Sequence, residues 1–257
     1  MAHKASDLLV YLSETYKGDW KKIYNIVIKR EYPDWQEMEW TVGSVTENTI
    51  TILDEGYSDV LKKSYHPPFV LYYRGDISLL SDPKCFRLAV VCAGTCPASL
   101  LNKTINDLCD LSNNTVVVTS DGYIADKCSR GKGKKKCIWV KGCGLNTRVG
   151  AELVEAEIAI INNGGLIITP YPNGVTIGVL QAMERDYIIG GLCDALLVSY
   201  AEKGTNISSS IISALNGGKD IMVYPTYPSK DLTINNTLIK EGAILVEDTS
   251  DIEENIK

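Results

Sequence analysis

The stretch FRLAVVCAGTCPASLLNKTINDLCDLSNNTVVVTSDG, residues 86–122, decides the fold class of this chain. It opens with the apolar run FRLAVVCAG, residues 86–94, and a second, valine-rich run follows in TVVVTSDG, residues 115–122. Between the two, PASLLNKTINDLCDLSNN, residues 97–114, has the length and the amphipathic pattern of a helix. Short strands that are buried on both faces and are each followed by a helix indicate a parallel sheet covered by helices.

The same alternation continues to the C-terminus. Further apolar runs begin at residues 137, 166, 194, 220 and 244, and helix-length segments lie between most of them. We therefore predict an α/β protein with an extended Rossmann-like fold and a mostly parallel sheet. The glycine pairs at 164–165 and 217–218 are expected where helices end.

The N-terminal part has a different pattern. Apolar side chains recur at helical spacing over 8–12 and again over 20–27, which predicts a small N-terminal helical appendage. Residues 49–80 have the pattern of a strand, a short helix, a Pro-Pro turn and a second strand. The predicted organisation is a helical region over 1–45 and a Rossmann-like domain over 46–257, which includes this connecting segment.

The composition is that of a globular protein with an excess of acidic residues. The 257 residues are 45% hydrophobic and 23% charged, and the formal net charge is -6. No apolar run approaches the roughly 18 residues that span a bilayer, and the first residues do not resemble a signal peptide. We therefore expect a cytoplasmic protein without membrane contact.

The eight cysteines are expected to be reduced thiols. They are scattered between Cys85 and Cys193, and with only His3 and His66 in the chain no usual zinc spacing occurs. We predict neither a metal site nor a cofactor.

Four loops are expected beyond the carboxyl ends of the strands, where open parallel sheets bind ligands. They are residues 93–99, 119–136, 141–146 and 199–210. Their glycines and hydroxyls suit an anion such as phosphate. However, GCG at 142–144 lacks the third glycine of a dinucleotide fingerprint, and no P-loop motif occurs. No catalytic constellation is recognisable, so we predict no catalytic residue and no enzyme.

The segment RGKGKKK, residues 130–136, concentrates positive charge in an otherwise acidic chain. It belongs to the second of the four loops, so we expect it on the carboxyl-end edge of the sheet. A cationic rim beside phosphate-sized backbone turns suits a polyanion, which predicts contact with nucleic acid. The alternative is a solvated flexible turn.

The order of these motifs resembles the DNA-processing protein A family (DprA, also called Smf). The family's leading segment is similar to TILDEGYSDVLKKSYHPPFVLYYRGDISLL, its RNR-I-I-A-G-L-S-D motif to RDYIIGGLCDALLV, and its ending to NNTLIKEGAILV. KGCGLN and EKGTNISSSIISALNGGKDIMVYP match two further turns. The resemblance covers most of the chain. It implies a non-enzymatic protein that binds single-stranded DNA, forms a homodimer and hands the strand to a RecA-type recombinase during DNA uptake or recombination.

The family's phosphate-binding residues carry over in part. Arg185 matches the first arginine of RNR, and the turn 203–205 matches a lysine-serine-glycine turn. The chain departs from the family where CAG replaces G-S-R at Gly94, and where Asp186 and Tyr187 replace the rest of RNR. We interpret the chain as a divergent member in which the basic segment compensates for the missing arginines. The predicted DNA-binding residues are Arg185, Lys203, Gly204, Thr205, Gly94, Thr95, Ser120, Gly122, Lys127, Arg130, Lys132, Lys134, Lys135, Lys136, Gly142 and Gly144.

Two other functions stay open. The crevice could serve a nucleotide or nucleoside derivative, as in phosphoribohydrolase-like proteins, although EKGTNISSS lacks the glycine run and the downstream glutamate of their P-G-G-x-G-T-x-x-E motif. The chain could also be a degenerate scaffold that retains only dimerisation or partner docking.

Two groups of side chains are candidates for contacts. Tyr123, Tyr171 and Tyr187 are available for base stacking, with packing at a helix or sheet edge as the alternative. A self-complementary dimer patch is predicted because residues 166–192 and 206–219 carry more apolar side chains than one buried helix face requires, with core packing as the alternative. The patch candidates are Val175, Ile177, Val179, Leu180 and Met183.

Overall fold

The sheet confirms the predicted fold class. The structure is a computed structural model that describes residues 5–31, 33–147, 150–227 and 232–256. Within these residues, nine strands form one sheet in the order β1-β2-β6-β5-β4-β3-β7-β8-β9. β2 is antiparallel to both β1 and β6, and the other neighbouring strands run parallel. The protein therefore has an extended Rossmann-like α/β fold.

The elements follow the predicted alternation. The strands are β1 (Asn48–Thr51), β2 (Val70–Gly75), β3 (Phe86–Ala93), β4 (Thr115–Thr119), β5 (Cys137–Val140), β6 (Leu166–Thr169), β7 (Ala195–Ala201), β8 (Asp220–Val223) and β9 (Ile244–Leu245). The helices are α1 (Ala5–Tyr16), α2 (Trp20–Lys29), α3 (Trp35–Gly43), α4 (Asp59–Lys62), the 3-10 helix η1 (Ile77–Leu80), α5 (Ala98–Asp110), α6 (Gly122–Arg130), α7 (Ala151–Asn162), α8 (Val179–Leu192), α9 (Ser208–Asn216), α10 (Asn235–Lys240) and α11 (Thr249–Asn255).

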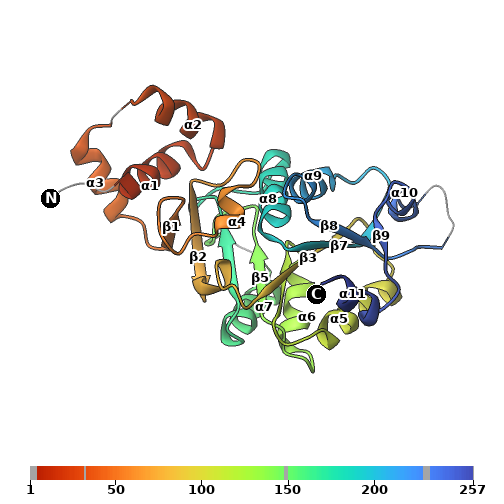
Figure 1. Cartoon of the computed structure of the whole chain (residues 1–257). Coiled ribbons are helices and arrows are strands. Elements are labelled where there is room, and N and C mark those ends of the chain that lie inside the picture. Colours follow the sequence, from red (N-terminus) through yellow and green to blue (C-terminus); the bar gives the residue numbers. More distant parts are fainter. Residues whose placement is uncertain (1–4, 32, 148–149, 228–231, 257) are drawn as a thin grey trace.

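Helices cover both faces of the sheet (Figure 1). Val116 and Val118 of β4 pack into one apolar cluster with α8, α9 and α10, while Val117 packs into a second cluster with α5, α6, α7 and α11. Successive strand residues point to opposite faces, so a continuous apolar run supplies both clusters. This arrangement explains why the strands lack a polar face.

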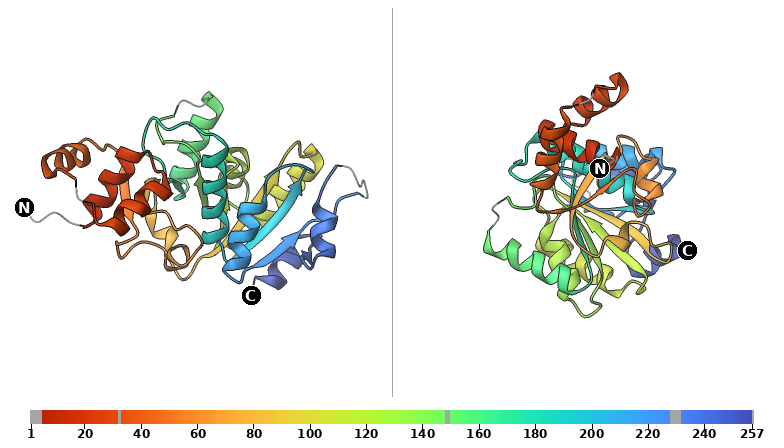
Figure 2. Two further views of the ribbon diagram at one scale, coloured as in Figure 1. Left: turned by 90° about the horizontal axis from the view of Figure 1, so that it is seen from above. Right: turned by 90° about the vertical axis from the view of Figure 1, so that its left-hand side faces the viewer.

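The N-terminal helices α1–α3 lie beyond the antiparallel end of the sheet (Figure 2). They enclose a small core of their own, formed by Tyr11, Leu12, Ile23 and Met38. α1 also contributes to the core beside β2, so the helical region rests on the sheet. The helices end at Gly43 and β1 begins at Asn48. The division into units over 1–45 and 46–257 stays a prediction.

Residues 119–136 differ from the expected loop. Asp121 caps α6 by accepting hydrogen bonds from the backbone N–H groups of Tyr123 (2.8 Å) and Ile124 (3.2 Å). α6 then carries the chain from the carboxyl end of β4 back to the amino end of β5, because β4 and β5 are parallel. Residues 131–136 therefore lie at the amino-end edge of the sheet. The predicted placement of RGKGKKK on the carboxyl-end edge is wrong.

Glycines end two of the helices and allow two others to pack closely. Gly164 (φ +71°) and Gly218 (φ +66°) adopt the left-handed conformation just after α7 and α9, which confirms the predicted helix ends. A Cβ added to Gly190 would lie 2.1 Å from the carbonyl oxygen of Ser210, so glycine lets α8 pack closely against α9. This close contact fixes the position of α8, the helix that carries Arg185, against α9.

In the described parts of the chain, no helix is long and apolar enough to cross a membrane.

Candidate functional site

A polar hollow of about 400 Å³ opens at the carboxyl ends of the central strands. β3 contributes Cys92, the turn after β4 contributes Ser120 and Asp121, and α8 contributes Arg185 and Asp186. The turn before α9 closes it with Asn206 and Ile207. It occupies the place where ligands bind in open α/β sheets, and we refer to it as the carboxyl-edge hollow.

Arg185 lines the carboxyl-edge hollow, but its charge is already paired. Its Nε and Nη2 atoms donate hydrogen bonds of 2.9 and 2.7 Å to Oδ1 of Asp186. Burial raises the pKa of Asp186, and the neighbouring guanidinium opposes this rise. A phosphate that enters the hollow must therefore compete with Asp186 for Arg185.

A carboxylate also occupies the turn that follows β3. The backbone N–H of Thr95 donates a 2.7 Å hydrogen bond to Oε2 of Glu202. Gly94 has φ +92°, and a Cβ at this position would lie 2.3 Å from the Glu202 side chain. Gly94 and Thr95 therefore lie near the hollow as predicted, but the turn holds an internal anion. Sequence reasoning missed Glu202, although an acid directly after a buried strand at this edge was a usable signal.

The turn after β4 leads directly into α6, and contacts with Trp139 hold it in place. The backbone carbonyl of Ser120 accepts a 3.1 Å hydrogen bond from Nε1 of Trp139. A Cβ at Gly122 would lie 2.7 Å from the Trp139 ring, so Gly122 is required for packing at this position. Ser120 and Gly122 both line the hollow, in agreement with their predicted placement.

The turn 203–205 follows β7 and leads to the hollow through Asn206. Lys203 and Gly204 are exposed. Thr205 donates a 2.6 Å hydrogen bond from Oγ1 to the backbone carbonyl of Glu202, which closes the turn. Gly204 has φ +91° and open space beside it. Lys203 is therefore an exposed cation on the turn that precedes Asn206, and it does not itself line the hollow.

The basic residues of 127–136 are dispersed by the fold. Lys135 is only 2% exposed, and its Nζ donates hydrogen bonds to the backbone carbonyls of Leu111 and Ser112, before β4. Burial lowers its pKa. Lys127 and Arg130, on α6, both form ion pairs with Asp126. Lys132, Lys134 and Lys136 are exposed at the amino-end edge. The fold therefore does not bring these residues together with Arg185, and their binding of DNA stays a prediction.

Replacing Lys135 by methionine is expected to lower the free energy of unfolding by about 1 kcal/mol, because two carbonyls lose a hydrogen bond while the aliphatic stem is kept. Urea unfolding measures the change. Lys132→Met, at an exposed position of the same segment, is the matched control and is expected to change stability by less than about 0.5 kcal/mol. Equal effects of both substitutions would contradict a structural role for Lys135.

The KGCGLN turn does not reach the hollow either. Gly142 is buried against Ile177, and Gly144 is buried against Pro172, whose carbonyl oxygen would lie 2.4 Å from an added Cβ. Gly144 also donates a 2.9 Å backbone hydrogen bond to Val175. Gly142 and Gly144 therefore follow the carboxyl end of β5, but the turn packs against the segment before α8 and does not line the hollow. Their binding of DNA stays a prediction.

The three candidate stacking tyrosines differ in accessibility. Tyr123 is 48% exposed, and the Lys127 Nζ lies 5.0 Å from its ring centroid. Tyr187 is partly buried among other aromatic rings. Tyr171 is 3% exposed and packs against Gly18, so it has no open face for a base. The prediction for Tyr171 is wrong.

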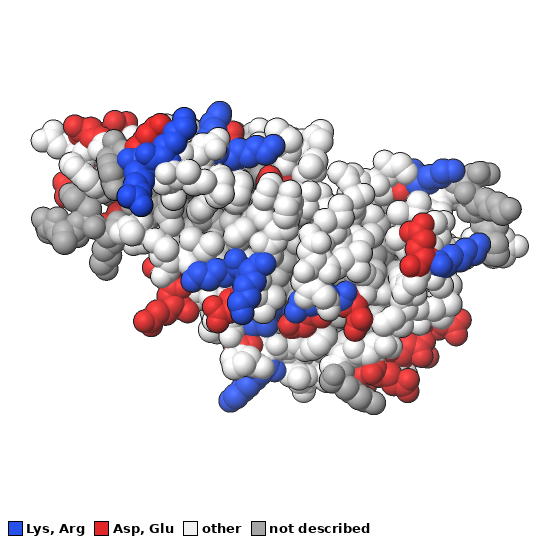
Figure 3. Space-filling view, turned by 45° about the horizontal axis from the view of Figure 1, so that its top comes forward, with Lys and Arg blue, Asp and Glu red and all other residues white. Residues whose placement is uncertain are grey.

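Charge is distributed unevenly over the molecule. On the face shown in Figure 3, lysine and arginine side chains gather at the end that carries the N-terminal helices. The carboxyl-edge hollow, in contrast, places Asp121 and Asp186 beside Arg185. Among the described residues, no group of three or more histidine, cysteine, aspartate or glutamate side chains has the arrangement of a metal site. The hollow is therefore a mixed polar site with a paired cation.

A mostly parallel sheet with helices on both faces and a polar hollow at its carboxyl edge defines a Rossmann-like binding fold. Residues 48–257 match the family model of DNA recombination-mediator protein A, and the chain belongs to this family. The predicted membership of the DprA/Smf family is confirmed.

Relatives and solved structures agree with this membership. The chain is 26% identical over 211 residues to the DNA processing protein DprA of Streptococcus pneumoniae, covering 79% of this chain and 72% of that protein. It is 25% identical over 195 residues to the protein Smf of Borreliella burgdorferi, covering 73% of this chain and 60% of that protein.

Two solved structures share the fold. The crystal structure of DprA from S. pneumoniae superposes with a TM-score of 0.72 at 21% identity, covering 100% of this chain and 94% of that one. DNA processing protein A from Helicobacter pylori, described by its single-stranded DNA binding mode, superposes with a TM-score of 0.67 at 21% identity, covering 82% of this chain and 95% of that one.

Proposed function

We propose that this protein binds single-stranded DNA at the carboxyl-edge hollow, without a catalytic step, and passes the strand to a RecA-type recombinase. The observation that supports this most strongly is the family match over residues 48–257 together with Arg185 at the hollow. A relative from H. pylori is described as binding single-stranded DNA. The recombinase as partner rests on the family resemblance.

The geometry of the hollow supports phosphate binding in which Arg185 exchanges its partner Asp186 for a DNA phosphate. The guanidinium of Arg185 leaves Asp186 and forms charge-assisted hydrogen bonds with a backbone phosphate. Lys203, exposed on the adjoining turn, contacts a neighbouring phosphate. Because these contacts read the backbone and no base, binding is expected to be insensitive to sequence and to weaken with salt.

A salt-titrated binding assay tests this function. We expect single-stranded oligonucleotides to bind more tightly than duplexes and mononucleotides. The logarithm of the association constant is expected to fall linearly with the logarithm of the salt concentration, and we call the gradient of this line the salt slope. Binding of a mononucleotide at the same affinity as an oligonucleotide would favour a nucleotide- or nucleoside-binding protein instead. That second candidate draws support from Asp121 and Asp186 in the hollow, because carboxylates accept hydrogen bonds from ribose hydroxyls. If the protein bound no nucleic acid even at low salt, the remaining function would be that of a scaffold for dimerisation or partner docking.

The exposed lysines of the basic segment give a discriminating prediction. Neutralising Lys132, Lys134 and Lys136 to glutamine is expected to leave the affinity for single-stranded DNA within about twofold and the salt slope unchanged, because they lie at the opposite edge from the hollow. Lys203→Gln is the matched comparison and is expected to lower the slope. A lower slope in the triple variant would instead support the original hypothesis that this segment compensates for missing arginines.

We also propose a homodimer through the segment that precedes and begins α8. Val179 is 79% exposed and Leu180 is 69% exposed, next to Ile177 at 54%. Val175 and Met183 are partly buried beside them. An apolar patch of this kind suits a two-fold contact. Light scattering at micromolar concentration is expected to show a dimer for the wild type and a 28.2 kDa monomer for Leu180→Asp. A wild-type monomer with and without DNA would contradict the proposal.

A further inference from the structure

Four rings form a continuous stack between the N-terminal helices and the sheet domain. Tyr24 and Trp20 lie one turn apart on α2 with their ring centroids 4.8 Å apart, at an interplanar angle of 13°. Trp20 stacks on His66 at 4.2 Å, and His66 stacks on Tyr65 at 4.2 Å. We call these four residues, Tyr24, Trp20, His66 and Tyr65, the aromatic stack.

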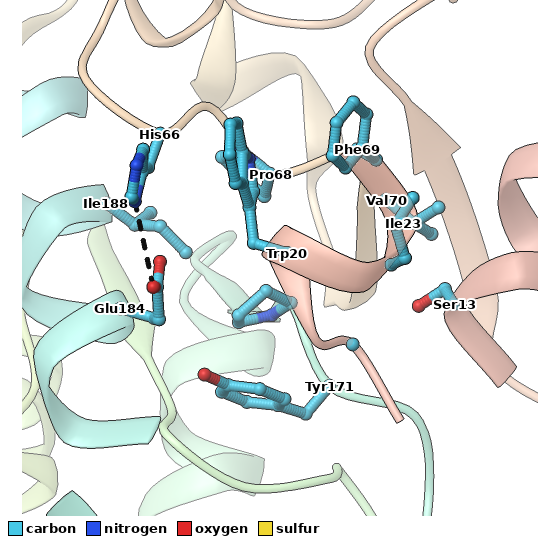
Figure 4. A pocket seen from close by; sticks show the side chains of 12 residues that line it. Ser13, Trp20, Ile23, His66, Pro68, Phe69, Val70, Tyr171, Glu184 and Ile188 are labelled. Atoms are coloured by element: carbon cyan, nitrogen blue, oxygen red, sulfur yellow. Dashed lines mark ion pairs between the residues drawn. The ribbon is translucent and has the colours of Figure 1, made fainter. Parts of the chain in front are cut away.

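The inner rings are held firmly in place. Nε1 of Trp20 donates a 2.8 Å hydrogen bond to the carbonyl of Pro67, and Phe69 packs on the same indole at 5.5 Å. Figure 4 shows Trp20 between His66, Pro68 and Phe69, above Tyr171. Burial and the charge of Lys21 lower the pKa of His66, which disfavours its protonated form. The dashed contact of 3.7 Å joins Nδ1 of His66 to Glu184 of α8, and it is a charged pair only when the imidazole is protonated.

The outer rings are open to solvent. Tyr24 is 43% exposed and Tyr65 is 48% exposed, whereas Trp20 joins α2 to His66 and Pro67, the residues before β2. Lys21, three residues before Tyr24 on α2, is an exposed cation on the same side of the helix, whereas Lys22 and Lys29 pair with Asp19 and Glu31. Lys21 lies close enough to Glu184 and His66 for its charge to affect their pKa values. Flat, exposed rings beside cations match the bases and phosphates of a single strand.

α8 connects the aromatic stack to the carboxyl-edge hollow. Tyr187 contacts Tyr65 in a T-shaped arrangement with ring centroids 5.2 Å apart, while Arg185 and Asp186, which precede it on α8, line the hollow. The two sites are thus separated by about one helix width, on the order of 10 Å. Tyr65 and the hollow therefore flank the same helix.

We propose that the outer rings of the aromatic stack, Tyr65 and Tyr24, stack on unpaired bases of the DNA strand whose phosphates bind at the carboxyl-edge hollow. The inference rests on the proposed function and adds a base-contacting surface formed jointly by α2 and the segment before the Pro-Pro turn. Recognition is by base stacking, so any base sequence is accepted.

The test compares two probes: oligothymidine of about 20 nucleotides, and an abasic sugar-phosphate strand of the same length. Tyr65→Ala and Tyr24→Ala are each expected to weaken binding of oligothymidine about tenfold. Tyr65→Phe and Tyr24→Phe keep the ring and are expected to bind as the wild type does. All four variants are expected to bind the abasic strand with wild-type affinity, because that strand has no base to stack.

The outcomes separate the two proposals. No binding of either probe by the wild type would overturn the proposed function. Binding by the wild type with unchanged affinity of both alanine variants for oligothymidine would overturn the stacking inference alone. Equal losses on the abasic strand would also overturn it, since the rings would then act through the fold. Thermal unfolding of each variant confirms that the substitutions at these exposed positions leave the protein folded.

Discussion

Arg185→Ala is expected to weaken binding of single-stranded DNA by about 1 to 3 kcal/mol, the scale of a charge-assisted hydrogen bond. Arg185 is the cation that lines the carboxyl-edge hollow within the described residues. Its removal also leaves Asp186 and Asp121 there without a compensating charge. The remaining carboxylates repel a phosphate, so the loss is expected near the upper end of this range. Fluorescence anisotropy of a labelled oligonucleotide at low salt measures it.

Arg185→Lys provides the matched control. Lysine keeps the positive charge but cannot form the same two-nitrogen contact. Arg185→Lys is therefore expected to lose less DNA affinity than Arg185→Ala does. Thermal unfolding shows whether each variant is folded, because Arg185 also pairs with Asp186 within α8. Wild-type affinity in a folded Arg185→Ala protein would show that the hollow does not bind the phosphates.

Asp186→Asn is expected to tighten binding of single-stranded DNA about tenfold, which equals about 1.4 kcal/mol. The asparagine side chain still accepts a hydrogen bond from Arg185 but carries no charge, so the guanidinium becomes available to a phosphate. Asp186 stands where the family's RNR motif has an amide, and the substitution restores that residue type. Unchanged or weaker binding by the folded variant would show that Asp186 does not restrain Arg185.

The ion pair between Arg185 and Asp186 also predicts that binding of single-stranded DNA depends on pH. Burial raises the pKa of Asp186, so this carboxylate takes up a proton at a higher pH than an exposed aspartate does. Once protonated it no longer holds Arg185 by charge, and DNA affinity is expected to rise as the pH falls through that raised pKa. Asp186→Asn removes the titrating group and is expected to flatten this rise. A wild-type affinity that falls over the same interval would contradict the sign.

The succession of strands and helices was predictable because each element leaves a local periodic pattern. Buried parallel strands appear as short apolar runs, and helices such as α8 appear as amphipathic segments between them. α6 was missed because its first residues look like a glycine-containing turn. That omission had a large consequence, since a single helix decides at which edge of a parallel sheet the next loop lies. The basic segment was therefore placed at the wrong edge.

Much of the candidate site depends on contacts that no local pattern records. Nothing in the sequence of KGKKK distinguishes Lys135, which is buried against two carbonyls, from its exposed neighbours. Glu202 reaches Thr95 across more than a hundred residues of chain. The aromatic stack joins Trp20 to His66 in the same way. In contrast, Arg185 and the turn at Lys203 were predictable, because they follow motifs whose order is kept along the chain.

The most direct test is to map where the strand lies. A single-stranded oligonucleotide with photoreactive thymines is crosslinked to the full chain, and the modified peptides are identified by mass spectrometry. We expect crosslinks within residues 91–96, 120–123, 185–187 and 203–207, which surround the carboxyl-edge hollow, and at Tyr65 and Tyr24, on which the bases are proposed to stack. Crosslinks confined to residues 131–136, at the amino-end edge of the sheet, would contradict binding at the hollow.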